Sequence, residues 1–148
     1  MHTLLLLLLL LPQQSPAKAA IKSSVAYTNS HLKQFKQITH PHEDGISLEG
    51  GQSEAYYSKD TLKLIVDKTY GETSQIVAHY YFNNKQLIFA YIVKYDYNVP
   101  INLEQFDLKK SRKTEQRYYP PINKEIQNKA YSLAKQFSVG KTTNGIEM

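Results

Sequence analysis

Apolar and polar residues alternate through the middle of the chain, between residues 53 and 97, where branched and aromatic residues dominate. Successive side chains of a β-strand point to opposite faces, so this period of two indicates strands. Three short polar segments that suit tight hairpin turns separate the runs: residues 58–61, 70–73 and 83–85. The pattern predicts four consecutive antiparallel strands, and residues 113–119 predict a fifth that Pro120-Pro121 stops.

Helical spacing replaces alternation on both sides of this block. The N-terminal apolar stripe steps by three or four residues through Ile21, Val25, Thr28, Leu32 and Phe35. This helix is expected to end at His40-Pro41, because proline disfavours helical geometry in the residue before it. A clearer stripe consists of Ile122, Ile126, Ala130, Leu133 and Phe137, and it ends near Gly140. The chain therefore predicts an α+β fold, an antiparallel β-meander of about five strands with an N-terminal helix and a C-terminal amphipathic helix packed on the sheet.

Both faces of the predicted sheet carry apolar residues. The bulkier face of the longest strand holds Leu87, Phe89, Tyr91 and Val93, and we assign it to the core under the C-terminal helix. The opposite face holds Ile88, Ala90 and Ile92. That face is either covered by the N-terminal helix or partly open, and an open apolar face would be the best candidate for a partner surface.

The first residues have the pattern of a secretory signal peptide. Eight consecutive leucines, Leu4 to Leu11, precede the small-x-small site Ala17-Lys18-Ala19. A membrane span needs roughly 20 apolar residues, so no transmembrane segment is expected after signal cleavage. We expect a signal peptide over 1–19, a single α+β domain over 20–140, a flexible tail over 141–148, and a periplasmic or extracellular location. The sequence has no cysteine, and the lack of disulfides favours a bacterial over an animal secreted protein.

Positive charge is concentrated in the last third of the chain, where residues 98–148 contain nine lysines or arginines against five acidic residues. Five of these bases form a cluster that is the candidate binding patch: Lys109, Lys110, Arg112, Lys113 and Arg117. Such a cluster could bind an anionic polymer or membrane headgroups. Alternatively, it is a charged edge strand that resists aggregation. An exported protein is not expected to bind nucleic acid.

Three Tyr-Tyr pairs mark the predicted strands, and the first two each precede a polar turn and a leucine. The characteristic segments are Gly50-Gly51, Tyr56-Tyr57, Tyr70-Gly71-Glu72-Thr73, Tyr80-Tyr81-Phe82, Leu87-Ile88-Phe89 and Arg117-Tyr118-Tyr119. From about residue 50 to 119, this order resembles a group of small exported bacterial proteins with Tyr-Tyr-bearing β-hairpin repeats. The resemblance implies the hairpin fold and no particular activity. Tyrosine also suits binding surfaces, because it combines a large apolar ring with a polar hydroxyl.

Two features could support chemistry. The loop His40-Pro41-His42-Glu43-Asp44 is rich in metal-ligand residue types, but no third ligand is identified elsewhere, and we expect neither a metal nor a cofactor. His79 lies in a predicted strand without a recognisable nucleophile motif. The leading hypothesis is an exported non-enzymatic binding or interaction domain of the bacterial cell envelope, with an envelope protein or an anionic or sugar polymer as its partner. The alternative is a small periplasmic hydrolase that uses His79 or the His40–Asp44 loop.

Overall fold

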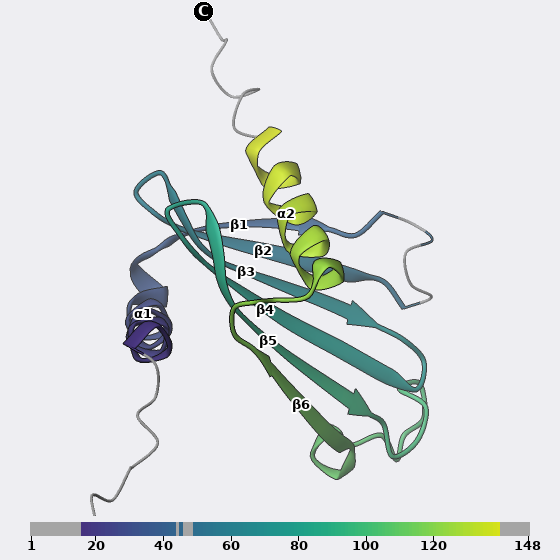
Figure 1. The fold of residues 1–148 in the computed structure, drawn as a ribbon. Helices are drawn as coiled ribbons and strands as arrows, with labels where there is room; N and C mark the ends of the chain where they lie inside the picture. The colour runs from purple at the N-terminus through teal and green to yellow at the C-terminus, as the bar shows by residue number, and fades with distance from the viewer. Residues whose placement is uncertain (1–15, 44, 46–48, 140–148) are drawn as a thin grey trace, which may run out of the picture.

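A computed structural model describes residues 16–43, 45 and 49–139 of the chain. Its elements in chain order are α1 (Pro16–His31), the 3₁₀ turn η1 (Leu32–Gln34), β1 (Lys36–Pro41), β2 (Gly51–Ser58), β3 (Thr61–Tyr70), β4 (Ser74–Asn83), β5 (Gln86–Asp96), the 3₁₀ turn η2 (Leu108–Lys110), β6 (Arg112–Tyr118) and α2 (Lys124–Val139). The six strands form one antiparallel sheet in chain order, with α2 across one face (Figure 1). The fold is therefore α+β, an antiparallel meander with an N-terminal and a C-terminal helix.

The sheet has one strand more than the sequence pattern predicts. The predicted N-terminal helix ends at His31 instead of continuing to His40, and Lys36–Pro41 form β1. Strand β1 pairs with β2, and Ile38 lies opposite Ala55 and packs against the core. The β-branched pair Ile38-Thr39 favours a strand, and pairing with β2 satisfies the backbone of this segment.

The predicted hairpins are confirmed. Strands β2 and β3 are joined at Lys59-Asp60, and strands β4 and β5 at Asn84-Lys85. Lys59, Asn84 and Lys85 have positive φ angles of 55°, 47° and 66°, as such tight turns require. The predicted fifth strand is β6, which begins and ends one residue earlier than expected.

A β-bulge in the β4–β5 pair changes which residues share a face. Tyr81 pairs with Phe89 and Phe82 pairs with Leu87, so Ile88 is an extra residue in β5. One extra residue reverses the faces that follow it. Leu87 therefore packs under α2, whereas Phe89 packs on the face toward α1. The prediction that Leu87, Phe89, Tyr91 and Val93 share the face under the C-terminal helix is wrong.

The main core lies between α2 and the sheet. The predicted C-terminal stripe is confirmed, because Ile126, Ala130, Leu133 and Phe137 are all buried. They pack on sheet residues Ala55, Tyr57, Ile65, Ala78, Tyr80, Phe82, Leu87 and Ala90. The carboxamide oxygen of Asn123 accepts a hydrogen bond from the Ile126 backbone N–H at 3.0 Å, which caps the N-terminus of the helix.

Each Tyr-Tyr pair contributes one ring to each face of the sheet. Tyr57, Tyr80 and Tyr118 belong to the cluster under α2, and Tyr56, Tyr81 and Tyr119 belong to the cluster on the α1 side. This follows from the alternation of side chains along a strand. The pairs therefore build two apolar layers at once.

The N-terminal segment predicted to direct export extends into α1. The leucine run and the predicted tail, 141–148, lie outside the described residues. The small-x-small site Ala17-Lys18-Ala19 lies in the first turn of α1. Among the described helices, none is long and apolar enough to cross a membrane.

Candidate functional site

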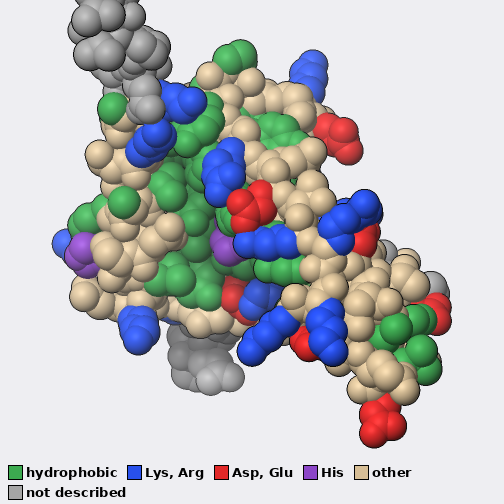
Figure 2. All heavy atoms as spheres, turned by 90° about the horizontal axis from the view of Figure 1, so that it is seen from below, with side chains coloured by type: hydrophobic (Ala, Val, Ile, Leu, Met, Phe, Trp, Pro, Cys, Tyr) green, Lys and Arg blue, Asp and Glu red, His purple; other side chains and the backbone are tan. Residues whose placement is uncertain are grey.

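A groove of about 570 Å³ lies between α1 and the sheet face opposite α2. Its floor includes Leu64, Val66, Tyr81 and Phe89. Helix α1 contributes Ile21, Val25 and Ala26, and η1 contributes Leu32. Figure 2 shows hydrophobic surface in this hollow, with lysine and arginine side chains at its edge. The volume falls within the range of about 300–1,000 Å³ that is common for small-molecule sites. We therefore treat this groove as the candidate functional site.

Two cross-strand rows form the floor of the groove. In the first row Leu64 pairs with Tyr81, and Tyr81 pairs with Phe89. In the second row the pairing runs through Val66, His79, Tyr91 and Arg117 from β3 to β6. Residues directly opposite on antiparallel strands point to the same face, so each row projects toward α1.

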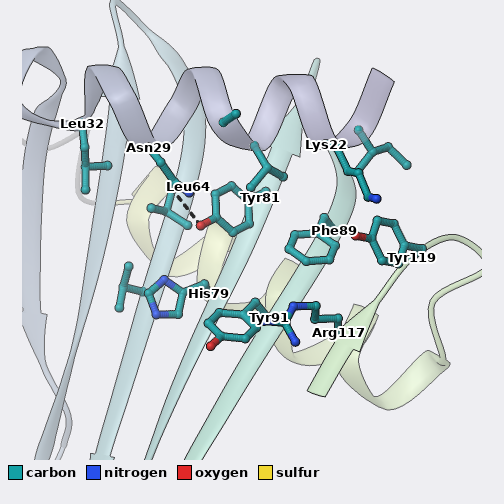
Figure 3. Close-up of a pocket in the computed structure, with 14 residues that line it drawn as sticks. Lys22, Asn29, Leu32, Leu64, His79, Tyr81, Phe89, Tyr91, Arg117 and Tyr119 are labelled. Carbon is teal, nitrogen blue, oxygen red and sulfur yellow. Dashed lines mark hydrogen bonds between the residues drawn. The ribbon is translucent and has the colours of Figure 1, made fainter. Parts of the chain in front are cut away.

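Helix α1 is held to the sheet near both of its ends. Near the C-terminal end, the Tyr81 hydroxyl donates a hydrogen bond to Asn29 Oδ1 at 2.9 Å (Figure 3). Near the N-terminal end, the Lys18 ammonium lies 4.5 Å from the centre of the Tyr119 ring, a cation–π contact. Between these points, Ile21 and Val25 pack toward the sheet cluster. The groove is therefore roofed by a helix that the sheet fixes in place.

The charged side chains that line the groove are cationic. Among its described lining residues, Lys22 and Arg117 are positively charged and none is acidic. The Arg117 guanidinium lies 5.0 Å from the Tyr91 ring centre, and its Nη2 donates to Glu115 Oε2 at 3.0 Å. Burial, together with the nearby Lys68 charge, lowers the pKa of His79 more than Glu54 raises it. His79 is therefore neutral at neutral pH.

Beside the groove, Glu54 is buried among its own partners. It accepts hydrogen bonds from Lys68 Nζ at 2.6 Å, Gln52 Nε2 at 2.6 Å and the Tyr56 hydroxyl at 2.8 Å. Burial raises the pKa of Glu54, but these hydrogen bonds outweigh it and the net shift is downward. Burial and Glu54 in turn raise the pKa of Tyr56 to about 12. Glu54 is held as a carboxylate, which does not suit proton donation at neutral pH.

The His40–Asp44 loop converges with an acid on the other face of the sheet. His42 Nε2 lies 2.8 Å from Asp67 Oδ1 and 3.2 Å from Ser53 Oγ. The Ser53 hydroxyl donates to Asp67 Oδ1 at 2.6 Å, and Lys129 Nζ lies 3.4 Å from Asp67 Oδ2. A shallow cleft of about 440 Å³ lies beside this cluster. This convergence is the geometry that the hydrolase alternative requires.

The hydrogen bonds of this cluster do not match nucleophilic catalysis. In a Ser-His-Asp site, serine donates to one ring nitrogen and the acid holds the other. Here Ser53 donates directly to Asp67, and both side chains lie within hydrogen-bond distance of the same nitrogen of His42, Nε2. The other nitrogen, Nδ1, is buried without a hydrogen-bond partner among the described residues, against Gly51. The cluster ties the β1–β2 loop to β3.

The other described residues of the loop do not join this cluster. Asp44 lies outside the described residues. The His40 ring stacks on Phe137 with centroids 4.4 Å apart. Glu43 is exposed. Within the described part of the chain, no three histidine or acidic side chains are grouped closely enough to hold a metal ion.

The basic cluster divides between η2 and β6. Arg112 pairs with Asp96 at 2.8 Å, and both Lys113 and Arg117 pair with Glu115. Hydrogen bonds from Lys113 and then Tyr91 lower the pKa of Glu115 to about 2. Lys109 and Lys110 lie in η2. Of the five bases, Arg117 alone lines the groove. A binding role for Lys109, Lys110, Arg112 and Lys113 stays a prediction.

Sequence reasoning found parts of this groove without joining them. It identified the α1 stripe, His79 and Arg117, and it noted an open second face as the best candidate for a partner surface. It gave that face Ile88, Ala90 and Ile92, whereas Ala90 and Ile92 pack under α2. It did not single out Lys22, Asn29, Tyr91 or Tyr119 as site residues. Tyr91 could have been found from its place on the longest alternating strand, and Lys22 from its position next to the stripe residue Ile21.

No protein-family model, curated protein or solved structure matches the chain. The groove, its charges and its anchored helix are therefore the basis for assigning a function.

Proposed function

We propose that the protein is an exported, non-enzymatic binding domain of the bacterial cell envelope, and that the groove between α1 and the sheet is its ligand site. One observation carries the proposal: an apolar groove of about 570 Å³ lies between the sheet and α1, which the Tyr81–Asn29 hydrogen bond and the packing of Ile21 and Val25 hold on the sheet. The size favours a small ligand with an apolar body over a protein or a polymer.

The protonation states of the groove residues support binding over catalysis. His79 is neutral at neutral pH and lies against Tyr91, with ring centroids 5.7 Å apart. Burial raises the pKa of both Tyr81 and Tyr91, so both stay protonated. General acid–base catalysis needs a group whose pKa lies near the working pH and a partner that receives the proton. The described lining contains no acidic residue to form such a pair with His79.

Occupation of the groove is tested with the neutral fluorescent probe N-phenyl-1-naphthylamine. Ala26 is exposed on α1 and lines the groove, so Ala26→Trp places a large ring in the groove without removing a core residue. We expect this variant to bind the probe about tenfold more weakly than wild type, because the ring occupies apolar space that the probe needs. Fluorescence titration of the purified protein measures the effect.

Ser23→Trp is the matched control, since Ser23 is exposed on the same helix and is not among the groove residues. It should leave the affinity for the probe unchanged. Equal affinity in the Ala26→Trp variant and wild type, or no probe binding in wild type, would contradict the proposed site.

Export is supported by the leucine run and by Ala17-Lys18-Ala19, and it predicts a mature N-terminus at Ala20. Cleavage there removes the first turn of α1 together with the Lys18–Tyr119 contact. We expect mass spectrometry of the protein from a bacterial periplasm or culture medium to show the loss of residues 1–19. Ala19→Arg should block this cleavage, whereas Lys18→Gln should not, because the middle position has no size requirement. Recovery of the intact wild-type chain in the membrane fraction would refute export by cleavage.

A further inference from the structure

The groove has a cationic end and an apolar end. Figure 3 shows Lys22 and Arg117 toward the same end as Tyr119, and Leu32 and Leu64 toward the other. The contacts agree with this arrangement. Arg117 is one strand away from Tyr91 on β5, and Lys18, one helical turn before Lys22, lies over Tyr119. Leu32, in η1 directly after α1, packs with the cluster that includes Leu64.

An uncharged ligand would not account for cationic side chains that lie at one end of the groove only. Lys22 and Arg117 both line the groove, and none of its described lining residues is acidic. The nearest carboxylate on the same strand as Arg117 is Glu115, which Lys113 shares. Both cationic side chains are exposed, and the Arg117 side chain is 54% exposed. Positive charge contributed by both α1 and β6 at one end of the groove favours an anionic group there.

Arg117 is placed to bind such an anion directly. Its guanidinium has five N–H donors, and the contact to Glu115 uses Nη2. The remaining donors form the fork that matches the two oxygens of a carboxylate. The Tyr91 ring beneath the guanidinium, 5.0 Å away, holds it in position over the groove floor.

We infer that the groove binds a single-chain amphiphile with an anionic head, with the head at Arg117 and Lys22 and the hydrocarbon chain along Phe89, Tyr81 and Leu64. This inference rests on the proposed function, because it names the class of ligand for the same groove. The long chain matches the continuous apolar row of Leu64, Tyr81 and Phe89 on the groove floor. The single anionic head matches a cationic site at one end.

Displacement of N-phenyl-1-naphthylamine by dodecanoate and by dodecanol, both below the concentrations at which they aggregate, tests the inference. The two compounds have the same chain and differ in the charge of the head. We expect dodecanoate to displace the probe from the wild-type protein at a concentration about tenfold lower than dodecanol, since a charge-assisted hydrogen bond has that order of effect. Arg117→Gln should remove most of this preference and leave displacement by dodecanol unchanged.

Arg112→Gln is the matched control, because Arg112 lies on the same strand, pairs with Asp96 and does not line the groove. It should keep the full preference for dodecanoate. Equal displacement by acid and alcohol, or an undiminished preference in Arg117→Gln, would overturn the anionic head and leave the proposed groove standing. Failure of the probe to bind wild type would instead refute the proposed function. A protein that sediments with anionic phospholipid vesicles but does not release the probe to dodecanoate would bind a membrane surface instead of a single-chain amphiphile. That result would also overturn the inference.

Discussion

Replacing Phe137 with alanine is expected to lower the free energy of unfolding by about 3–5 kcal/mol, as truncation of a core phenylalanine does. Phe137 is 1% exposed and is one of the largest fully buried side chains of the described structure. It joins α2 to the sheet, and its ring also stacks on His40 of β1 at 4.4 Å. The loss therefore removes a contact that links the last helix to the first strand.

Chemical denaturation, followed by circular dichroism, measures this change. Val139→Ala is the control, because Val139 lies two residues further along α2 and is 62% exposed. It should shift the free energy of unfolding by less than about 0.5 kcal/mol. A Phe137→Ala protein as stable as the Val139→Ala protein would show that α2 does not form the core described above.

Gly51→Ala is expected to destabilise the fold by about 3 kcal/mol, at the upper end of the usual cost of overpacking. A Cβ at Gly51 would clash with the backbone oxygen of Lys68 and with His42 Nδ1. The first contact is with strand backbone at the start of β2, where Gly51 pairs with Thr69, so it cannot be relieved by a side-chain rotation. The second contact pushes His42 away from Asp67 and Ser53.

Gly71→Ala provides the comparison for this change. The Cβ at Gly71 would lie 3.3 Å from its nearest contact, the backbone oxygen of Ser74, which a small shift relieves. We expect a cost below about 1 kcal/mol for this variant in thermal or chemical unfolding. Equal stability of the two variants would mean that the His42–Gly51 packing is wrong.

The hairpins could be predicted from the sequence because their signals are local. Alternation marks each strand, and Asn83-Asn84-Lys85 and Tyr70-Gly71-Glu72-Thr73 mark the turns. The C-terminal helix was equally clear, since all four stripe residues within α2 are buried. Strand β1 was not predicted because its local signals are weak. It is an edge strand with no fully buried residue, and Phe35, directly before it, continues the helical stripe.

The arrangement of the faces could not be read from the pattern. Bulges at Lys63 in β3 and Ile88 in β5 each insert one residue, and neither position has a glycine or another local signal. The insertion at Ile88 moves Phe89 and Tyr91 from the α2 side to the groove. The groove depends on this shift and on where α1 crosses the sheet, and tertiary packing decides both.

The clustering of His42, Ser53 and Asp67 also required the tertiary structure. Ser53 and Asp67 are opposite each other on β2 and β3, which a register prediction could have given. The return of His42 to this pair depends on the β1–β2 loop and on the close approach to Gly51. The sequence therefore identified the histidine and not its partners.

Nuclear magnetic resonance of the ¹⁵N-labelled protein, titrated with N-phenyl-1-naphthylamine, tests most directly whether the groove is the ligand site. We predict that the largest amide shifts occur along α1 near Ala26 and on the strands at Tyr81, Tyr91 and Arg117, all of which line the groove. Amides of the His42 loop and of η2 should move little. Shifts centred on His42 and Ser53, on Lys109 and Lys110, or spread evenly over the chain would contradict the account.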